Sequence, residues 1–205
     1  KYTWILLLGL ITIALLANPA HSNVGEIGQI KGSGVLEREG KIVIDGDVGV
    51  NVKSMDEAVT ANGTMRIDFV DETRVELTQQ SRLVIDEFVY DPANDVGSLS
   101  IKASLGTVRY ASGQIAKKYK QNVKIRTPSA TIAVRGTDFI MVVDEMGGSM
   151  ITLLPSCDTA GICYVGEIEV MTDAGFVVLN QAFQATATVH GMRKPTSPVI
   201  LDIDE

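Results

Sequence analysis

Aromatic side chains are scarce in this sequence of 205 residues, where they make up only 5% and include a single tryptophan, Trp4. Histidine is scarcer still, with two residues. Proteins that bind single-stranded nucleic acid stack the bases on aromatic side chains, and many glycan-binding proteins use similar platforms. The composition therefore argues against large stacking platforms and against chemistry that needs several imidazoles.

A long apolar run is also lacking. The uncharged run 4–17 has 14 residues, whereas a membrane-spanning helix needs roughly 20. Ala20 and Ser22 follow it with the −3 and −1 spacing of a signal-peptidase site, so residues 1–22 are predicted to be a signal peptide cleaved after Ser22. An uncleaved anchor is the alternative, because a thinned bilayer accommodates a short helix. Both interpretations place the rest of the chain in the periplasm or outside the cell.

Basic residues are outnumbered by acidic ones. The net charge is −7, and it becomes −8 once the leader with its one lysine is removed. An acidic surface repels phosphate backbones and anionic lipid headgroups. Nucleic acid is therefore excluded as a partner, and we expect membrane contact only through an uncleaved leader.

Sequence motifs of catalysis are absent. The chain has neither a G-x-S-x-G element nor a P-loop, and His190 is the only histidine after the leader. Paired carboxylates such as Asp68 and Asp71 would suit a glycosidase, but acids on the outer face of a soluble sheet are expected anyway. We therefore expect no enzymatic activity and no cofactor.

Cysteine occurs only twice, at Cys157 and Cys163. An even count in an exported chain predicts a disulfide, here one that closes a hairpin tip. Closing so short a loop is expected to stabilise the fold by about 2 kcal/mol. A zinc site is the alternative, but His190 would be its only imidazole ligand.

What the chain does have is period-2 alternation of apolar and polar residues, which predicts half-buried strands. Turn sequences separate these short segments, for example Asn62-Gly63 and Asp71-Glu72. The expected fold is all-β, an extended solenoid-like or sandwich-like arrangement of many short strands over residues 23–191. The alternation is clearest at Met65, Ile67, Phe69, Val75, Leu77, Leu83, Ile85, Leu99 and Ile101.

Two segments depart from this pattern. The basic stretch 114–120 is predicted to form either one or two helical turns or a solvated surface loop. Residues 192–205 contain Pro195 and Pro198, which indicate a linker or tail. The apolar residues 199–201 within this tail are expected to dock as an edge strand.

The run Thr127–Phe139 resembles the signature of the FecR domain family, "TPxATxxVRGTDF". Phe69–Thr73 is similar to the family's "FxDGT" element, with Glu72 where the family usually has glycine. Further blocks occur in the expected order and bring the resemblance to roughly residues 30–145: Gly34-Val35, Gly46-Asp47, Asp56, Thr60, Ser81-Arg82-Leu83 and Gly106-Thr107-Val108-Arg109.

The resemblance implies a periplasmic, all-β module with an extended sheet arrangement. In family members that regulate iron uptake, a cytoplasmic segment controls a sigma factor, and a terminal domain contacts an outer-membrane receptor. Only residues 1–3 precede the apolar run here, so we expect no segment that holds a sigma factor. A sensing or docking role towards an envelope protein, such as an outer-membrane receptor or a secretion component, remains the expected function.

Within the signature, Arg135 and Asp138 are predicted to pair across Gly136, because a guanidinium matches a carboxylate in bidentate geometry. The alternative is that Arg135 faces outward and binds an anionic ligand or a partner's carboxylate.

Two other functions remain open. Binding of peptidoglycan or exported polysaccharide would use exposed rings, and the candidates are Tyr90, Tyr110 and Tyr164, each of which could instead be core or edge packing. A structural assembly would stack unpaired sheet edges of several chains, so oligomers are possible.

Overall fold

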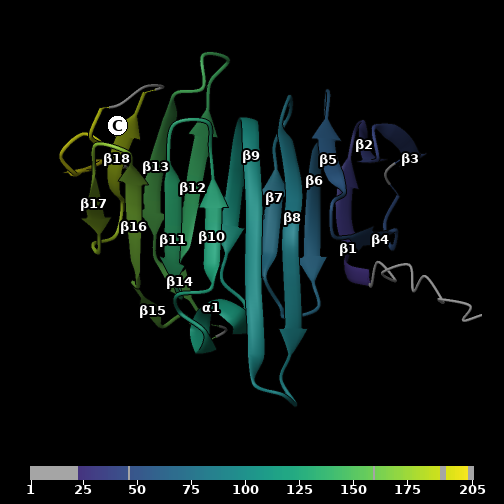
Figure 1. Cartoon of the computed structure of the whole chain (residues 1–205), viewed down its shortest axis with the longest axis horizontal. Helices are drawn as coiled ribbons and strands as arrows, with labels where there is room; N and C mark the ends of the chain where they lie inside the picture. Colours follow the sequence, from purple (N-terminus) through teal and green to yellow (C-terminus); the bar gives the residue numbers. More distant parts are fainter. Residues whose placement is uncertain (1–22, 46, 159, 190–192, 203–205) are drawn as a thin grey trace, which may run out of the picture.

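The computed structural model describes residues 23–45, 47–158, 160–189 and 193–202 (Figure 1). Strands make up most of the described chain, so the predicted all-β class is confirmed. The predicted signal peptide, His190 and the end of the tail lie outside the described residues. No helix in the described ranges is both long enough and apolar enough to cross a membrane.

The paired strands form two layers that overlap in Figure 1. In spatial order, the first layer consists of β4 (Asn51–Lys53), β1 (Asn23–Lys31), β6 (Thr64–Phe69), β7 (Arg74–Leu77), β9 (Val96–Ala111), β12 (Asp138–Val143), β13 (Ser149–Leu154), β18 (Gln184–Thr188) and β19 (Val199–Ile200). The second layer consists of β3 (Lys41–Asp45), β2 (Gly34–Arg38), β5 (Glu57–Thr60), β8 (Arg82–Asp91), β9, β10 (Val123–Arg126), β11 (Thr131–Arg135), β16 (Glu167–Thr172) and β17 (Gly175–Leu179).

The long strand β9 belongs to both layers. Its first part pairs with β8 and β10, and its last part pairs with β7 and β12. Gly106 lies at the change of layer with a positive φ of 87°, and a Cβ there would approach Ser81 to 2.2 Å. The position therefore requires glycine, both for the backbone conformation and for the close approach.

The core lies between the layers and is built from the alternating apolar residues that the sequence predicts. In β6 and β7, Met65, Ile67, Val75 and Leu77 are at most 1% exposed, while the intervening residues face outward. Burying each such side chain contributes about 2 kcal/mol relative to exposure. The period-2 alternation therefore determines which face of each strand points to the core.

The basic segment after β9 contains one helical turn, α1 (Gln114–Lys118). The Asp71 carboxylate accepts hydrogen bonds from the Ile115 backbone N–H (3.0 Å) and the Thr73 hydroxyl (2.9 Å). Ile115 and Ala116 are fully buried. The helical alternative is thus correct, and the loop alternative fails because these two apolar residues pack into the core.

The C-terminal tail packs against the end of the first layer. Its apolar residues form β19, which pairs with β18 as the predicted edge strand. The preceding proline, Pro195, is buried, and the Thr196 N–H donates to the Ala187 carbonyl oxygen (2.9 Å). The described part of the tail is therefore attached along the sheet and is not a free linker.

Glu72 occupies a turn position that glycine fills in the family pattern, and its φ is +68°. A side chain in this left-handed region costs about 1 kcal/mol. Exchange of Glu72 for glycine removes this strain, but it also increases the entropy of the unfolded chain and removes the hydrogen bond that the Gln114 amide donates to Glu72 (2.7 Å). The free energy of unfolding is therefore expected to rise by less than about 1 kcal/mol in urea denaturation.

The matched control is Glu145→Gly, because Glu145 is also an exposed turn residue but has no positive φ. We expect the Glu145→Gly control either to leave the free energy of unfolding unchanged or to decrease it. If Glu72→Gly were as destabilising as Glu145→Gly, backbone strain at position 72 would be disproved.

Candidate functional site

The residues that carry the family resemblance lie where the chain passes between layers. Asp56 is fully buried and accepts two hydrogen bonds from the Arg38 guanidinium (2.6 and 2.7 Å) and one from the Lys53 N–H (2.8 Å). The hydrogen bond to Asp56 raises the pKa of Arg38 above its ordinary value. The hydrogen bonds of the Asp56 carboxylate hold the backbone in place just before β5. Because the carboxylate is buried and fully engaged, it is not available to a ligand.

In the signature run, Thr137 likewise forms buried hydrogen bonds where the chain passes between layers. It is fully buried between β11 and β12, and its hydroxyl donates to the Leu154 carbonyl and accepts from the Gly166 N–H, both at 3.3 Å. The Ser112 hydroxyl donates to the Thr137 carbonyl (2.7 Å) and accepts from the Thr137 N–H (2.9 Å). The threonine thus connects β9 with both ends of the segment 155–166.

The predicted pairing of Arg135 with Asp138 is wrong. Arg135 ends β11 in the second layer, where its guanidinium contacts Glu167 and lies 3.6 Å from Glu169 of the neighbouring β16. Asp138 begins β12 in the first layer, 3.9 Å from Arg109. The crossover between the layers separates the two residues, because it sends their side chains to opposite faces of the molecule.

The three tyrosines considered for ring stacking lie in different environments. Tyr110 is fully buried and stacks on Phe139 with ring centroids 5.3 Å apart, so it cannot touch a partner in this structure. Burial raises the pKa of Tyr110 well above its ordinary value. Tyr90 packs against the core, and only Tyr164 is largely exposed, at 49%. The structure therefore brings no two of them together.

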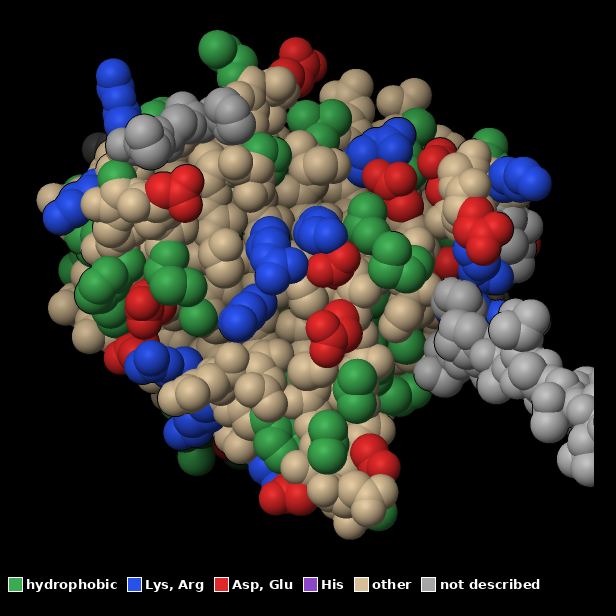
Figure 2. Space-filling view, viewed as in Figure 1, with side chains coloured by type: hydrophobic (Ala, Val, Ile, Leu, Met, Phe, Trp, Pro, Cys, Tyr) green, Lys and Arg blue, Asp and Glu red, His purple; other side chains and the backbone are tan. Residues whose placement is uncertain are grey.

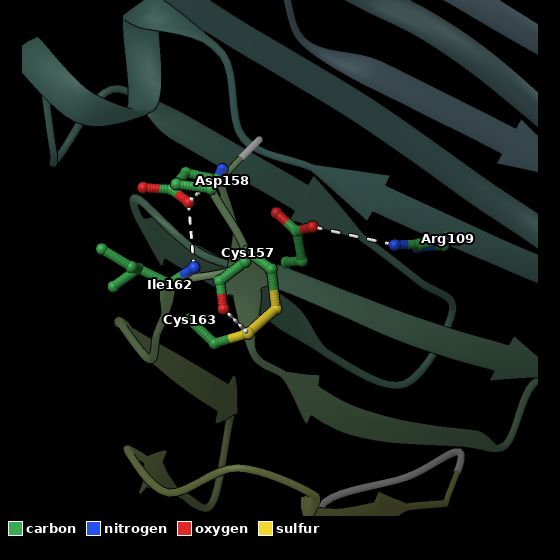
Figure 3. Close-up of a disulfide and its surroundings, with 8 residues drawn as sticks. Arg109, Cys157, Asp158, Ile162 and Cys163 are labelled. Atoms are coloured by element: carbon green, nitrogen blue, oxygen red, sulfur yellow. Dashed lines mark hydrogen bonds and ion pairs between the residues drawn. A yellow bond between two sulfur atoms is a disulfide. The ribbon is translucent and has the colours of Figure 1, made fainter.

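Tyr164 belongs to a short hairpin that the predicted disulfide closes (Figure 3). The hairpin consists of β14 (Ser156–Cys157) and β15 (Cys163–Tyr164), and a bond between Cys157 and Cys163 joins the two strands. Since both cysteines are bonded to each other, neither is free to ligate zinc. The Asp158 carboxylate accepts from the Ile162 N–H (2.9 Å) and further orders the turn.

Apolar side chains are exposed on this hairpin and just after it. Ile162 is 67% exposed and Val165 37%, in addition to Tyr164. The disulfide and the hydrogen bonds of Thr137 to the Leu154 carbonyl and the Gly166 N–H constrain the backbone that carries them. A preorganised apolar surface of this kind suits contact with a protein, because little conformational entropy is lost on binding.

A groove opens on each side of the hairpin. On the second-layer side, a groove of about 650 Å³ is lined by Lys120, Gln121, Arg135, Val165, Gly166, Glu167 and Asn180. On the first-layer side, a groove of about 300 Å³ is lined by Arg74, Glu76, Arg109, Ala111, Asp138, Pro155 and Cys157. Arg135 and Asp138 are thus not in contact, but they flank the same hairpin from its two sides.

Residues 56–155 match the sequence profile of the family described as FecR protein. The matched segment is just under half of the chain, and it includes the Phe69–Thr73 element and the whole signature run. The resemblance to the FecR domain that the sequence predicts is therefore confirmed over residues 56–155.

Two crystal structures of a "putative anti-sigma factor" from Parabacteroides distasonis have a similar fold, with TM-scores of 0.50 and 0.51. Each is 14% identical to this chain, and the likeness covers 70% of this chain and 58% of that protein. The chain therefore spans little more than half of the protein that it resembles. No curated protein shows significant sequence similarity to it.

The sequence pattern did not reveal the hairpin surface. Ile162 and Val165 were not singled out, since isolated apolar residues beside a cysteine give no periodicity signal. A weak signal existed in the loop itself, where Asp158 and Gly161 provide turn chemistry between the cysteines. The buried role of Thr137 was also missed, because a polar residue after Gly136 between two strands normally indicates an exposed turn.

The Thr137 hydroxyl can be tested by Thr137→Val, which keeps the shape of the side chain and removes the hydroxyl. The variant leaves the Gly166 N–H and the Leu154 carbonyl without their buried partner, so the free energy of unfolding is expected to fall by about 1–3 kcal/mol in urea denaturation. Thr131→Val in β11 is the control, because no hydrogen bond of that hydroxyl is seen in the described residues. Equal stability of both variants would contradict the assigned role.

Proposed function

We propose that this protein is a non-catalytic docking module of the bacterial envelope that contacts another envelope protein through its disulfide-closed hairpin. The observation that carries the proposal is the exposure of Ile162, Tyr164 and Val165 on a hairpin held by a disulfide. Exposed apolar groups on a rigid support are typical of protein contact sites.

Export is part of the proposal. Disulfides persist in oxidising compartments, so the Cys157–Cys163 bond is consistent with the periplasm or the extracellular space. The apolar leader supports the same compartment from the sequence. An envelope location also suits the family, in which the FecR domain is periplasmic.

A sensing role is the finer part of the proposal. The structural relative is described as a "putative anti-sigma factor", but the shared fold does not transfer that activity to this chain. For this chain we propose that occupancy of the hairpin reports the state of the partner.

The chain also passes repeatedly between two elongated layers, which favours the solenoid-like form of the predicted fold.

Glycan binding is less well supported. It would need adjacent exposed rings, whereas Tyr110 is buried and Tyr90 packs against the core. Tyr164 alone does not form a platform. The hairpin therefore fits a protein partner better than a polysaccharide.

A photo-crosslinking experiment in the native host tests the docking site. A benzophenone amino acid is placed at position 162, and a control is placed at position 146, where Met146 is 87% exposed in the β12–β13 turn. We expect position 162 to give one discrete crosslinked envelope protein that position 146 does not give, as detected by mass spectrometry.

The same experiment is repeated with Tyr164→Ser and Val165→Ser introduced together. Removing two of the three apolar contacts is expected to reduce the crosslink yield at least about fivefold, since each buried contact is worth roughly 1 kcal/mol or more. The proposal fails if both probe positions give the same products, or if the double variant gives an unchanged yield.

A further inference from the structure

The second layer ends in two edge strands of different chemistry. At one end β17 pairs with β16 alone among the described strands, and at the opposite end β3 pairs with β2 alone. An edge strand exposes unpaired N–H and C=O groups, which proteins usually protect with charged residues, proline or a covering segment. β3 fits this rule, because it begins with Lys41 and ends with Asp45. β17 contains neither a charged residue nor a proline.

The end of the molecule that β17 forms is uncharged and apolar. No charged residue occurs between Ala174 and Val189, in a chain of which 21% is charged. Phe176 is 60% exposed on β17, and Val199 and Ile200 are 57% and 62% exposed on β19, which ends the first layer. Figure 2 shows hydrophobic side chains at the left of the view, over β16 and β17. Exposed apolar groups beside an unprotected edge indicate a contact site.

The nearest charged groups lie beside β17 and leave its free edge clear. Glu169 is on the neighbouring strand β16, 3.6 Å from the Arg135 guanidinium. Asp173 is in the turn before β17, and the Lys194 side chain packs against Gly175, where an added Cβ would approach the lysine Cε to 2.8 Å. These charges border β16 or the start of β17. The described part of the free edge therefore presents backbone groups and apolar side chains.

The hairpin geometry determines which backbone groups of β17 are unpaired. A two-residue turn joins β16 to β17, with Thr172 opposite Gly175. In such a hairpin the residues that flank the turn exchange hydrogen bonds, and bonded pairs then alternate with non-bonded pairs. Val177 therefore bonds to β16, whereas the N–H and C=O groups of Phe176 and Val178 point to the free edge.

We propose that β17 pairs antiparallel with β17 of a second copy of this chain, around a two-fold axis beside Val177. In this register Phe176 lies opposite Val178 of the second copy, and Val178 lies opposite Phe176 of the second copy. The unpaired N–H and C=O groups of these residues then all form hydrogen bonds between the chains. Cross-strand pairs of an aromatic and a β-branched residue further stabilise such a sheet.

The charge of the chain favours a second copy as the occupant. At a net charge of −7, two copies repel each other over most of their surfaces, whereas the uncharged end lets them approach. The antiparallel register also places Asp173 opposite Gln181 of the second copy, so the two turn aspartates lie at opposite ends of the contact. A basic strand from another protein would find no carboxylate on the described part of this edge. The two-fold contact uses both β17 edges, so association stops at the dimer.

Sedimentation equilibrium of the exported protein, purified with its disulfide intact, tests the dimer. The contact is small, so a dissociation constant in the micromolar range is expected. Added salt is expected to strengthen the dimer, because it screens the repulsion between two acidic chains. A protein that stays monomeric up to about millimolar concentration, or one that assembles beyond the dimer, would contradict the proposal.

Phe176→Lys is the decisive variant, and Ile42→Lys is its matched control, because Ile42 is 66% exposed on β3 at the opposite end. Both variants add one positive charge to an edge strand. The dissociation constant is expected to rise at least about tenfold with Phe176→Lys, since the ammonium would have to lie against Val178 of the second copy, and less than about twofold with Ile42→Lys. Equal effects of the two variants would overturn the proposal.

Cysteine crosslinking tests the register, and it does not depend on the folding of the lysine variant. Val177→Cys faces itself across the two-fold axis in a non-bonded pair, where Cα atoms are about 4.5 Å apart and a disulfide can form. In Val178→Cys, the control, the two new thiols lie on strand positions roughly 8 Å apart, too far for a disulfide. Under mild oxidation, Val177→Cys is expected to give a covalent dimer and Val178→Cys is not.

The dimer contact is separate from the docking hairpin. The variant Tyr164→Ser/Val165→Ser is expected to leave the dissociation constant of the dimer unchanged, so failure of one proposal is distinguishable from failure of the other. Covalent dimers formed equally well from both cysteine positions would disprove the pairing of β17 around Val177.

Discussion

The structure depends on hydrogen bonds that satisfy buried polar groups wherever the chain passes from one layer to the other. A crossover segment that packs against the core buries N–H and C=O groups outside any strand ladder, and each unsatisfied group costs about 1–3 kcal/mol. Asp56 and Thr137 are fully buried at such passages, and their side chains supply missing partners. Asp71 is fully buried in the turn between β6 and β7, and its carboxylate accepts a hydrogen bond from the Ile115 N–H of α1, where the chain passes from β9 to β10. The buried polar residues of the family signature therefore serve folding, and the exposed apolar residues of the proposed docking hairpin lie outside the signature.

The positions of these passages determine which side chains are exposed and on which face of the molecule they lie. Thr137 fixes both ends of the segment that carries the disulfide, so the exposed apolar groups at Ile162 and Tyr164 are presented by a rigid base. The same crossover sends Arg135 and Asp138 to opposite faces. The proposed docking surface thus follows from local backbone features of the framework.

The strands and the disulfide were predictable from the sequence. Alternation at residues such as Ile67 and Ile101 reflects burial of one sheet face, and a chain with only two cysteines has one possible intramolecular pairing. The partner of Arg135 was not predictable. Sequence proximity favoured Asp138, whereas the antiparallel register with β16 placed Glu167 opposite the arginine.

Hydrogen exchange of individual backbone amides, followed by NMR, tests the central role of the crossovers most directly. The amides of Ile115 and Thr137 lie in passages between layers, and the amide of Thr73 donates to the buried Asp71 carboxylate that also accepts from Ile115. All three are predicted to exchange only through global unfolding, with the same protection as amides in the middle of β9 and β12. If these amides exchanged orders of magnitude faster than those of the strands, the crossovers would open independently. The fold would then not depend on the buried polar groups of the signature.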